Sequence, residues 1–287
     1  MLGEMKLNQS AAQLFIPDSV PEPESLSRIT HLGIGAHQDD LEFMAFHGIL
    51  NCYHSESEWF GGVTCTDGGG SPRSGPYADM SNEDMKKIRV QEQNDAAQVG
   101  HFAAMWQLAY PSAEIKDPAD GSLAKELEAI LRICRPRVVY THNLADKHDT
   151  HIAVVLAAIQ AMRALPEEDR PEKVLGCEVW RGLDWMNDSE KVALDVSGHE
   201  NLAMALNGIF DSQIAGGKRY DIATLGRRRA NATFFESHAT DEADQLSFAM
   251  DLTPLVADPS IDPIAFTTDV IRRFSEDVET RIAKFSP

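Results

Sequence analysis

From residue 30 onward, short apolar segments of strand length alternate with longer amphipathic segments. The two kinds of segment alternate four times, at residues 30–36, 41–54, 59–66, 82–100, 104–110, 122–135, 137–142 and 151–165. Such alternation predicts βαβ units, because parallel strands need a long crossover that is usually a helix. Parallel sheets are covered by helices on both faces. We therefore predict an α/β fold of Rossmann-like architecture with a mostly parallel sheet.

The rest of the chain extends this pattern without an internal repeat or a low-complexity tract. Residues 1–28 are polar and interrupted by prolines, which predicts an N-terminal arm, and residues 29–287 are predicted to form a single domain. A C-terminal elaboration of this domain is expected to contain strands at residues 173–180 and 191–197 and helices at residues 199–214, 221–235 and 264–285.

The composition restricts the possible partners. The chain has 26 Lys and Arg against 45 Asp and Glu, a net charge of −19. Nucleic acids are bound by clustered Lys and Arg, and the basic run Arg227–Arg229 is short, so we expect no nucleic-acid partner. No segment approaches the roughly 20 apolar residues of a membrane span. The first residues lack the basic start and apolar core of a secretory signal. We expect a cytoplasmic protein with a small-molecule substrate, and base rates make a homo-oligomer plausible.

The four cysteines, Cys52, Cys65, Cys134 and Cys177, are far apart and form no CxxC pair. Without a secretory signal, this spacing argues against a disulfide framework and excludes a cysteine-rich zinc site. For Cys65, Cys134 and Cys177, which lie in apolar stretches, we expect buried positions in the core.

Clusters of ionisable side chains follow two of the predicted strands. The first strand ends in "AHQDD", residues 36–40, and the fourth ends in "THNLADKHDTH", residues 141–151. Ligands of open parallel sheets bind beyond the carboxyl ends of the strands. The two clusters would meet at one edge of the sheet if these strands are neighbours. The alternative for Asp39 and Asp40 alone is that they cap the helix that follows.

Imidazole and carboxylate together are suited to Zn²⁺, which keeps three protein ligands and one open position in catalytic sites. His37 and Asp40, three residues apart, can turn toward one point, and the second cluster can supply a third ligand. Asp39 would then lie beside the metal, where a general base is needed. His148 is a candidate for stabilising an oxyanion or protonating a leaving group.

These residues resemble the motifs of the PIG-L (LmbE-like) zinc-dependent deacetylases. Ala36–Asp40 is similar to the "AHPDD" motif of that family, and residues 148–151, "HDTH", resemble its "HxDH" motif. Softer similarities lie in residues 64–75, in residues 89–100 and in residues 194–213, so that the resemblance spans roughly residues 30–240.

The resemblance implies His37, Asp40 and His151 as zinc ligands, with Fe²⁺ or another divalent metal as an alternative. It implies Asp39 as the base and His148 as the oxyanion-stabilising or general-acid histidine. Arg89 matches a substrate-binding arginine of the family. The implied reaction is removal of an N-acyl group, most often acetyl, from an amino sugar.

This sequence departs from the family motifs at two positions. Gln38 replaces a proline, for which we expect little effect. Thr150 replaces an aspartate that should orient the preceding histidine, which leaves the tuning of His148 open. Asp146 or Asp149 is then expected to take over that carboxylate role.

Two rival functions remain. A zinc hydratase of small unsaturated carboxylic acids would use the same metal and base, with Arg73 and Arg89 as binding groups for the acid. A nucleotide-binding module without catalysis is the second rival, although "DGGGSPRSG" lacks G-x-G-x-x-G spacing.

Three further side chains are weaker candidates for the site. His238 lies near Glu236 and Asp241 in the sequence. Trp180 and Trp185 are either a sugar-binding wall or core residues.

Overall fold

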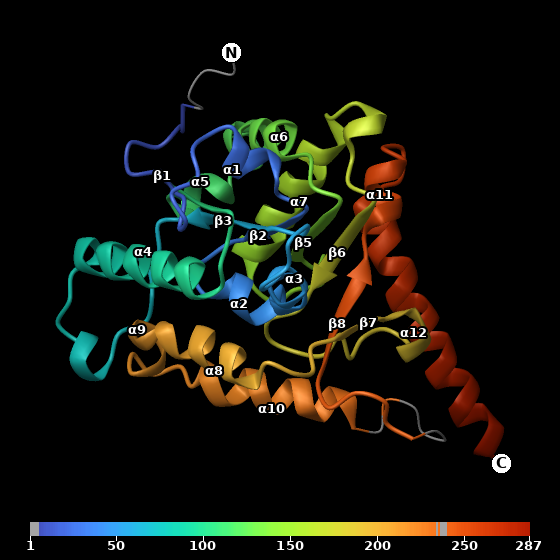
Figure 1. Cartoon of the computed structure of the whole chain (residues 1–287). Coiled ribbons are helices and arrows are strands. Elements are labelled where there is room, and N and C mark those ends of the chain that lie inside the picture. Colours follow the sequence, from blue (N-terminus) through green and yellow to red (C-terminus); the bar gives the residue numbers. More distant parts are fainter. Residues whose placement is uncertain (1–5, 234, 236–239) are drawn as a thin grey trace.

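The computed structural model describes residues 6–233, 235 and 240–287. One eight-stranded sheet forms its centre, in the order β1-β4-β3-β2-β5-β6-β8-β7 (Figure 1). The strands are β1 Gln13–Phe15, β2 His31–Gly35, β3 Phe60–Thr66, β4 Ala104–Tyr110, β5 Val138–His142, β6 Lys173–Cys177, β7 Val192–Asp195 and β8 Leu246–Asp251.

The central five strands of the sheet, β4-β3-β2-β5-β6, are parallel, and β1, β8 and β7 add antiparallel pairs at the two edges. The predicted α/β class and mostly parallel sheet are therefore confirmed. Strand β1 comes from the segment expected to be an arm and pairs with β4. Strand β8, which joins β6 to β7, was not predicted from the sequence.

Helices cover both faces of the sheet. One apolar cluster joins the sheet to α6, α7 and α11, and a second joins it to α2, α3, α4 and α8. The helices are α1 Glu24–Ser27, α2 Asp40–Met44, α3 Phe46–Cys52, α4 Asn82–Val99, α5 Ser112–Ile115, α6 Ser122–Cys134, α7 Asp149–Arg163, α8 Glu200–Ile209, α9 Asp211–Ile214, α10 Tyr220–Ala232, α11 Thr253–Ala257 and α12 Pro263–Phe285.

Helix α6 shows how the sequence pattern produces this packing. Leu123, Leu127, Ile130 and Leu131 recur at helical spacing and are all buried against the sheet. Full burial of such a side chain contributes about 1.5–3 kcal/mol to stability. Lys125, Glu128 and Arg132 occupy the opposite face of α6, so its orientation on the sheet follows from its own sequence.

The segment predicted as one helix at residues 41–54 forms two, α2 and α3. The break falls at Ala45, whose φ of −104° and ψ of 16° leave the helical region. Likewise, the segment at residues 199–214 divides into α8 and α9 at Phe210. The short α2 therefore ends independently of α3, and its first residues belong to the site described below.

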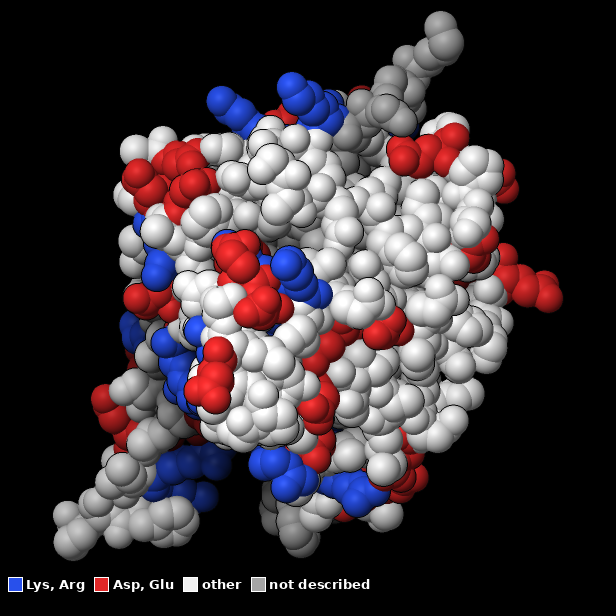
Figure 2. Space-filling model, turned by 90° about the vertical axis from the view of Figure 1, so that its left-hand side faces the viewer, with Lys and Arg blue, Asp and Glu red and all other residues white. Residues whose placement is uncertain are grey.

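All four cysteines are free and buried, as expected for Cys65, Cys134 and Cys177. In the part of the chain that the structure describes, no helix has the length and apolar character to cross a membrane. Lys and Arg lie scattered among acidic residues on the face shown in Figure 2, and the described residues form no continuous basic surface there.

Candidate metal centre and active site

The two polar clusters meet because β2 and β5 are neighbouring parallel strands. Their carboxyl ends lie at the same edge of the sheet, as the sequence predicted. His37 follows β2 in the loop that leads to α2, and Asp40 is the first residue of α2. His151 comes from the first turn of α7, which follows β5.

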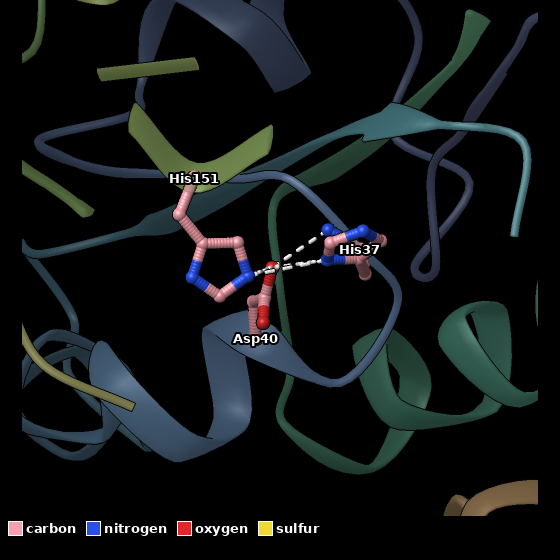
Figure 3. Close-up of side chains that lie close together, drawn as sticks. All are labelled: His37, Asp40 and His151. Atoms are coloured by element: carbon pink, nitrogen blue, oxygen red, sulfur yellow. Dashed lines mark hydrogen bonds and ion pairs between the residues drawn. The ribbon is translucent and has the colours of Figure 1, made fainter. Parts of the chain in front are cut away.

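His37, Asp40 and His151 converge on one point (Figure 3). His37 Nδ1 lies 3.4 Å from Asp40 Oδ2 and 3.3 Å from His151 Nε2. The distance from His151 Nε2 to Asp40 Oδ2 is 3.6 Å. Ligand atoms bonded at about 2.0–2.1 Å to a tetrahedral Zn²⁺ lie roughly 3.3–3.4 Å apart. The three atoms therefore fit a tetrahedral metal ion with one open position.

The charges around Asp40 favour metal binding. Burial alone would raise the pKa of Asp40, but the nearby His151 and His142 hold it well below the usual range. Burial lowers the pKa of His151, while the carboxylates of Asp40 and Asp146 outweigh this effect and raise it. A metal ion would take the place of the proton that these carboxylates attract to His151.

Asp146 orients His151 toward this point. The His151 Nδ1–H group donates to Asp146 Oδ2 at 3.1 Å, and the two side chains are 1% and 0% exposed. This bond leaves the lone pair of Nε2 free for a metal, the arrangement in which outer carboxylates fix ligating histidines. Asp146 Oδ1 also accepts the backbone N–H of His148 at 2.9 Å.

Neither Asp146 nor Asp149 orients the side chain of His148 in place of the aspartate that Thr150 replaces. Asp146 contacts the side chain of His151 and only the backbone of His148. Asp149 is exposed. Nδ1 of His148 is buried without a hydrogen-bond partner among the described residues. No carboxylate therefore orients the imidazole of His148 in this part of the chain.

His142 lies at the back of the site and was not singled out from the sequence. Its Nε2 accepts the backbone N–H of Ala36 at 2.9 Å and lies 3.3 Å from Asp40 Oδ2. Burial, together with the charge of His151, lowers the pKa of His142 to about 4, so its ring is neutral. Nε2 of His142 thus holds the loop that begins at Ala36, while Nδ1 of His142 has no hydrogen-bond partner among the described residues. His142, Asp146 and His151 form a second group that could hold a metal ion.

Asp39 stands beside the three candidate ligands. It has a φ of 96°, in the left-handed region that non-glycine residues rarely adopt. Its backbone N–H donates to Gln93 Oε1 at 3.2 Å, which helps to hold this conformation. Although Asp39 occupies the N-cap position of α2, its side chain makes no capping hydrogen bond. The simple capping role considered for Asp39 therefore does not describe the structure.

Burial raises the pKa of Asp39 well above its usual range, and Arg89 opposes that shift. Arg89 Nη2 lies 3.5 Å from Asp39 Oδ2 and donates to the carbonyl of Gln38. Only 2% of Arg89 is exposed. Arg89 thus lies in the wall of the site and holds the loop that carries Asp39. Gln93, one helical turn after Arg89, also holds the loop that carries Asp39. The only sequence signal for this role of Gln93 is its i, i+4 spacing from Arg89 in α4.

A cavity of about 320 Å³ opens onto the site. His37, Asp39, Asp40 and His148 line its base. The ring of His148 lies 5.0 Å from that of His37 and 4.7 Å from that of His151, measured between centroids. Burial and the neighbouring histidines lower the pKa of His148, so its imidazole is neutral.

Trp180 and Tyr220 form an aromatic wall of the cavity, with ring centroids 5.9 Å apart. Trp180 also stacks on His151, at an interplanar angle of 16°. Trp185, by contrast, packs against the apolar cluster of α6 and α7. Of the two tryptophans weighed as a sugar-binding wall, only Trp180 lines this cavity.

The remaining sequence candidates lie away from the site or outside the described part. Arg73 donates to the carbonyl of Gly69 and to Asn82 and does not line the cavity. Glu236 and His238 fall outside the described residues.

Part of the chain matches the model of a known family. Residues 32–162 match the PIG-L family model, described as GlcNAc-PI de-N-acetylase. None of the curated proteins compared with the sequence matches it.

Several solved structures share the fold. The conserved protein TT1542 of Thermus thermophilus is 18% identical, with a TM-score of 0.62 over 82% of this chain and 99% of the other. The 4-carboxy-2-hydroxymuconate hydratase of Pseudomonas putida is 17% identical, with a TM-score of 0.60 over 78% and 96%. The N,N'-diacetylchitobiose deacetylase of Pyrococcus horikoshii is 16% identical, with a TM-score of 0.56 over 76% and 82%.

Proposed function

We propose that the protein is a metal-dependent amide hydrolase that removes an N-acyl group, such as acetyl, from an amino-sugar-like substrate. The match of residues 32–162 to the PIG-L family model supports this proposal. The observation that carries the proposal is the position of Asp39. This buried carboxylate stands in the wall of a cavity next to His37, Asp40 and His151, which can hold one metal ion. The fold shared with a deacetylase of diacetylchitobiose supports the same interpretation.

His37, Asp40 and His151 would hold Zn²⁺ or, with the same donors, Fe²⁺. When bound, such an ion lowers the pKa of water and polarises an amide carbonyl. Asp39 accepts the proton of the attacking water, and its raised pKa brings it closer to the working pH of a general base. The protonated Asp39 can then donate to the departing amine. Neutral His148 faces the cavity and can donate a hydrogen bond to the oxyanion that forms.

The substrate would enter through the cavity beneath Trp180 and Tyr220. Aromatic faces are suited to the apolar face of a sugar ring, while Ser71 and Gln213 offer polar groups on the cavity lining. Lys116 and Lys218 also line the cavity, and neither has an ion-pair partner within the described ranges. They would favour a substrate that bears an anionic group.

The test is release of acetate from a panel of N-acetylated amino sugars, with and without anionic substituents. Wild-type protein loaded with zinc should release acetate, and Asp39→Asn should lose about 10²- to 10⁴-fold in kcat while it retains its metal. Asp149→Asn, which changes an exposed carboxylate of the same region, should act like wild type. Full activity in Asp39→Asn would refute the role of Asp39.

A hydratase of unsaturated carboxylic acids is the alternative function. Two observations favour it: the fold shared with a hydratase, and Lys116 and Lys218, which have no ion-pair partner among the described residues and could bind carboxylates. Of the two groups expected to bind such an acid, Arg73 does not line the cavity, whereas Arg89 lines it but already donates to the carbonyl of Gln38. Zinc-loaded protein that releases no acetate but bleaches the ultraviolet absorbance of an unsaturated dicarboxylic acid would select the hydratase.

A further inference from the structure

Helix α12, Pro263–Phe285, is the longest helix described, and most of its surface is exposed. Its 23 residues span about 34 Å, yet only Thr267 and Val270 are buried. Figure 1 shows α12 along one side of the molecule, with its C-terminal end projecting away from the sheet. Helices draw most of their stability from packing of an apolar face. The uncovered part of α12 therefore lacks the partner that its length implies.

The exposed face of α12 carries an apolar seam with a heptad repeat. Exposed apolar side chains occur every seven residues in a first row, and a second row, four residues after the first, holds two small polar side chains and one apolar side chain. The first row is Ile264, Ile271, Val278 and Phe285, which are 74%, 39%, 38% and 81% exposed, and the second is Thr268, Ser275 and Ile282, of which Ile282 is 62% exposed. Alternating steps of four and three residues are the spacing of a two-stranded coiled coil.

We propose that this seam is a homodimer interface, in which α12 pairs antiparallel with α12 of a second copy of the chain. A two-fold axis requires a self-complementary surface. With the axis between Ser275 and Val278, each Ile271 packs against Ile282 of the other copy. Thr268 then packs against Phe285 at each end of the seam.

Charge selects this antiparallel register. Arg272 and Glu279 each follow a seam residue and border the seam on the same side. The antiparallel pair places Arg272 beside Glu279 of the second copy, twice by symmetry. A parallel pair would instead place these two side chains beside Thr267 and Phe274, without an opposite charge. Glu279 has no cationic partner among the residues that the structure describes, and Arg272 pairs only within its own helix, with Asp269 and Glu276.

The mass of the full chain in solution tests the proposal, by sedimentation velocity over a concentration series at 0.15 M salt. Wild type should form a dimer. Ile271→Glu and Val278→Glu, which put a charge into the seam, should each weaken self-association at least tenfold. Ile264→Glu is the matched control, because Ile264 lies on the same stripe but beyond the overlap of the two helices, and this variant should dimerise like wild type. Circular dichroism should show that all three variants keep their helical content.

A charge exchange tests the register. Arg272→Glu and Glu279→Arg should each weaken the dimer, and the double variant should restore it. A monomeric wild type across the series would overturn the proposal. So would a dimer that tolerates both Ile271→Glu and Val278→Glu, since its interface would lie elsewhere. Loss of the dimer in Ile264→Glu, or failure of the double charge variant to recover, would overturn the register.

Discussion

Replacing Asp146 with asparagine tests how the site holds its metal, without touching a ligand. The wild-type carboxylate accepts the Nδ1–H group of His151 at 3.1 Å, and both side chains are almost fully buried. A hydrogen bond to a charged group contributes about 1.5–3 kcal/mol, and the neutral amide of Asp146→Asn forfeits most of that. At about 1.4 kcal/mol for each factor of ten, metal affinity should fall roughly 10- to 100-fold, in line with other outer carboxylates.

The assay is competition for zinc against a chromophoric chelator at pH 7.5. Asp149→Asn is the matched control, because Asp149 is an exposed acid three residues away in the sequence and lies at the start of α7. It should bind zinc like wild type. Unchanged affinity in Asp146→Asn, or an equal loss in Asp149→Asn, would refute the assignment of Asp146 as the residue that orients His151.

Three further predictions concern other parts of the site and its surroundings. Arg89→Met should lower kcat at least tenfold and keep the metal content. It should also move the acidic limb of the kcat/KM profile to higher pH, because removal of the guanidinium raises the pKa of Asp39 further. Arg89→Lys should recover part of the loss in kcat, and an acidic limb that does not move would contradict the effect of Arg89 on Asp39. Burial, with the nearby Asp146, raises the pKa of Glu178 to about 7. Glu178 therefore ionises near pH 4.5 in the unfolded chain and near pH 7 in the folded protein. Its burial lowers the free energy of unfolding by an amount that is zero below pH 4.5, grows between pH 4.5 and 7, and is constant above pH 7. Glu178→Gln should therefore stabilise the protein by up to about 3 kcal/mol at pH 8 and by nothing at pH 4, measured by urea unfolding. Zinc at 100 times its dissociation constant should add about 2.7 kcal/mol to the unfolding free energy of wild type, and much less to that of Asp40→Ala, in thermal melts with and without chelator.

The sequence predicted the parts of the fold that follow from periodicity. The five central strands and the long helices α4, α6, α7 and α12 were expected close to their observed positions, because short apolar runs alternate with longer helix-length segments, several of which end at Gly or Pro. Strands β1 and β8 were missed. The first is three residues long, and the second is an antiparallel strand between the helices expected at residues 221–235 and 264–285, where no element was predicted. Their place depends on partners distant in the sequence, which no local pattern reveals.

The same limit applies to the site. The convergence of the two clusters could be predicted, because a parallel sheet brings the ends of neighbouring strands together. The side chain or backbone group that each histidine contacts could not be predicted. His142 contacts Asp40 across the sheet, and Asp146 selects the ring of His151 although His148 is nearer in the chain. Gln93 reaches the backbone of Asp39 from another helix. Such contacts are set by side-chain geometry, which spacing alone does not determine.

The metal content of the purified chain shows whether His37, Asp40 and His151 bind one metal ion. Wild-type protein and Asp40→Ala would be equilibrated with zinc, freed of excess metal and measured by elemental analysis, with circular dichroism as a check on folding. We expect about one zinc ion per wild-type chain and far less in folded Asp40→Ala. A wild-type chain that retains no zinc, or an Asp40→Ala chain that retains as much as wild type, would contradict the assignment of His37, Asp40 and His151 as the metal site.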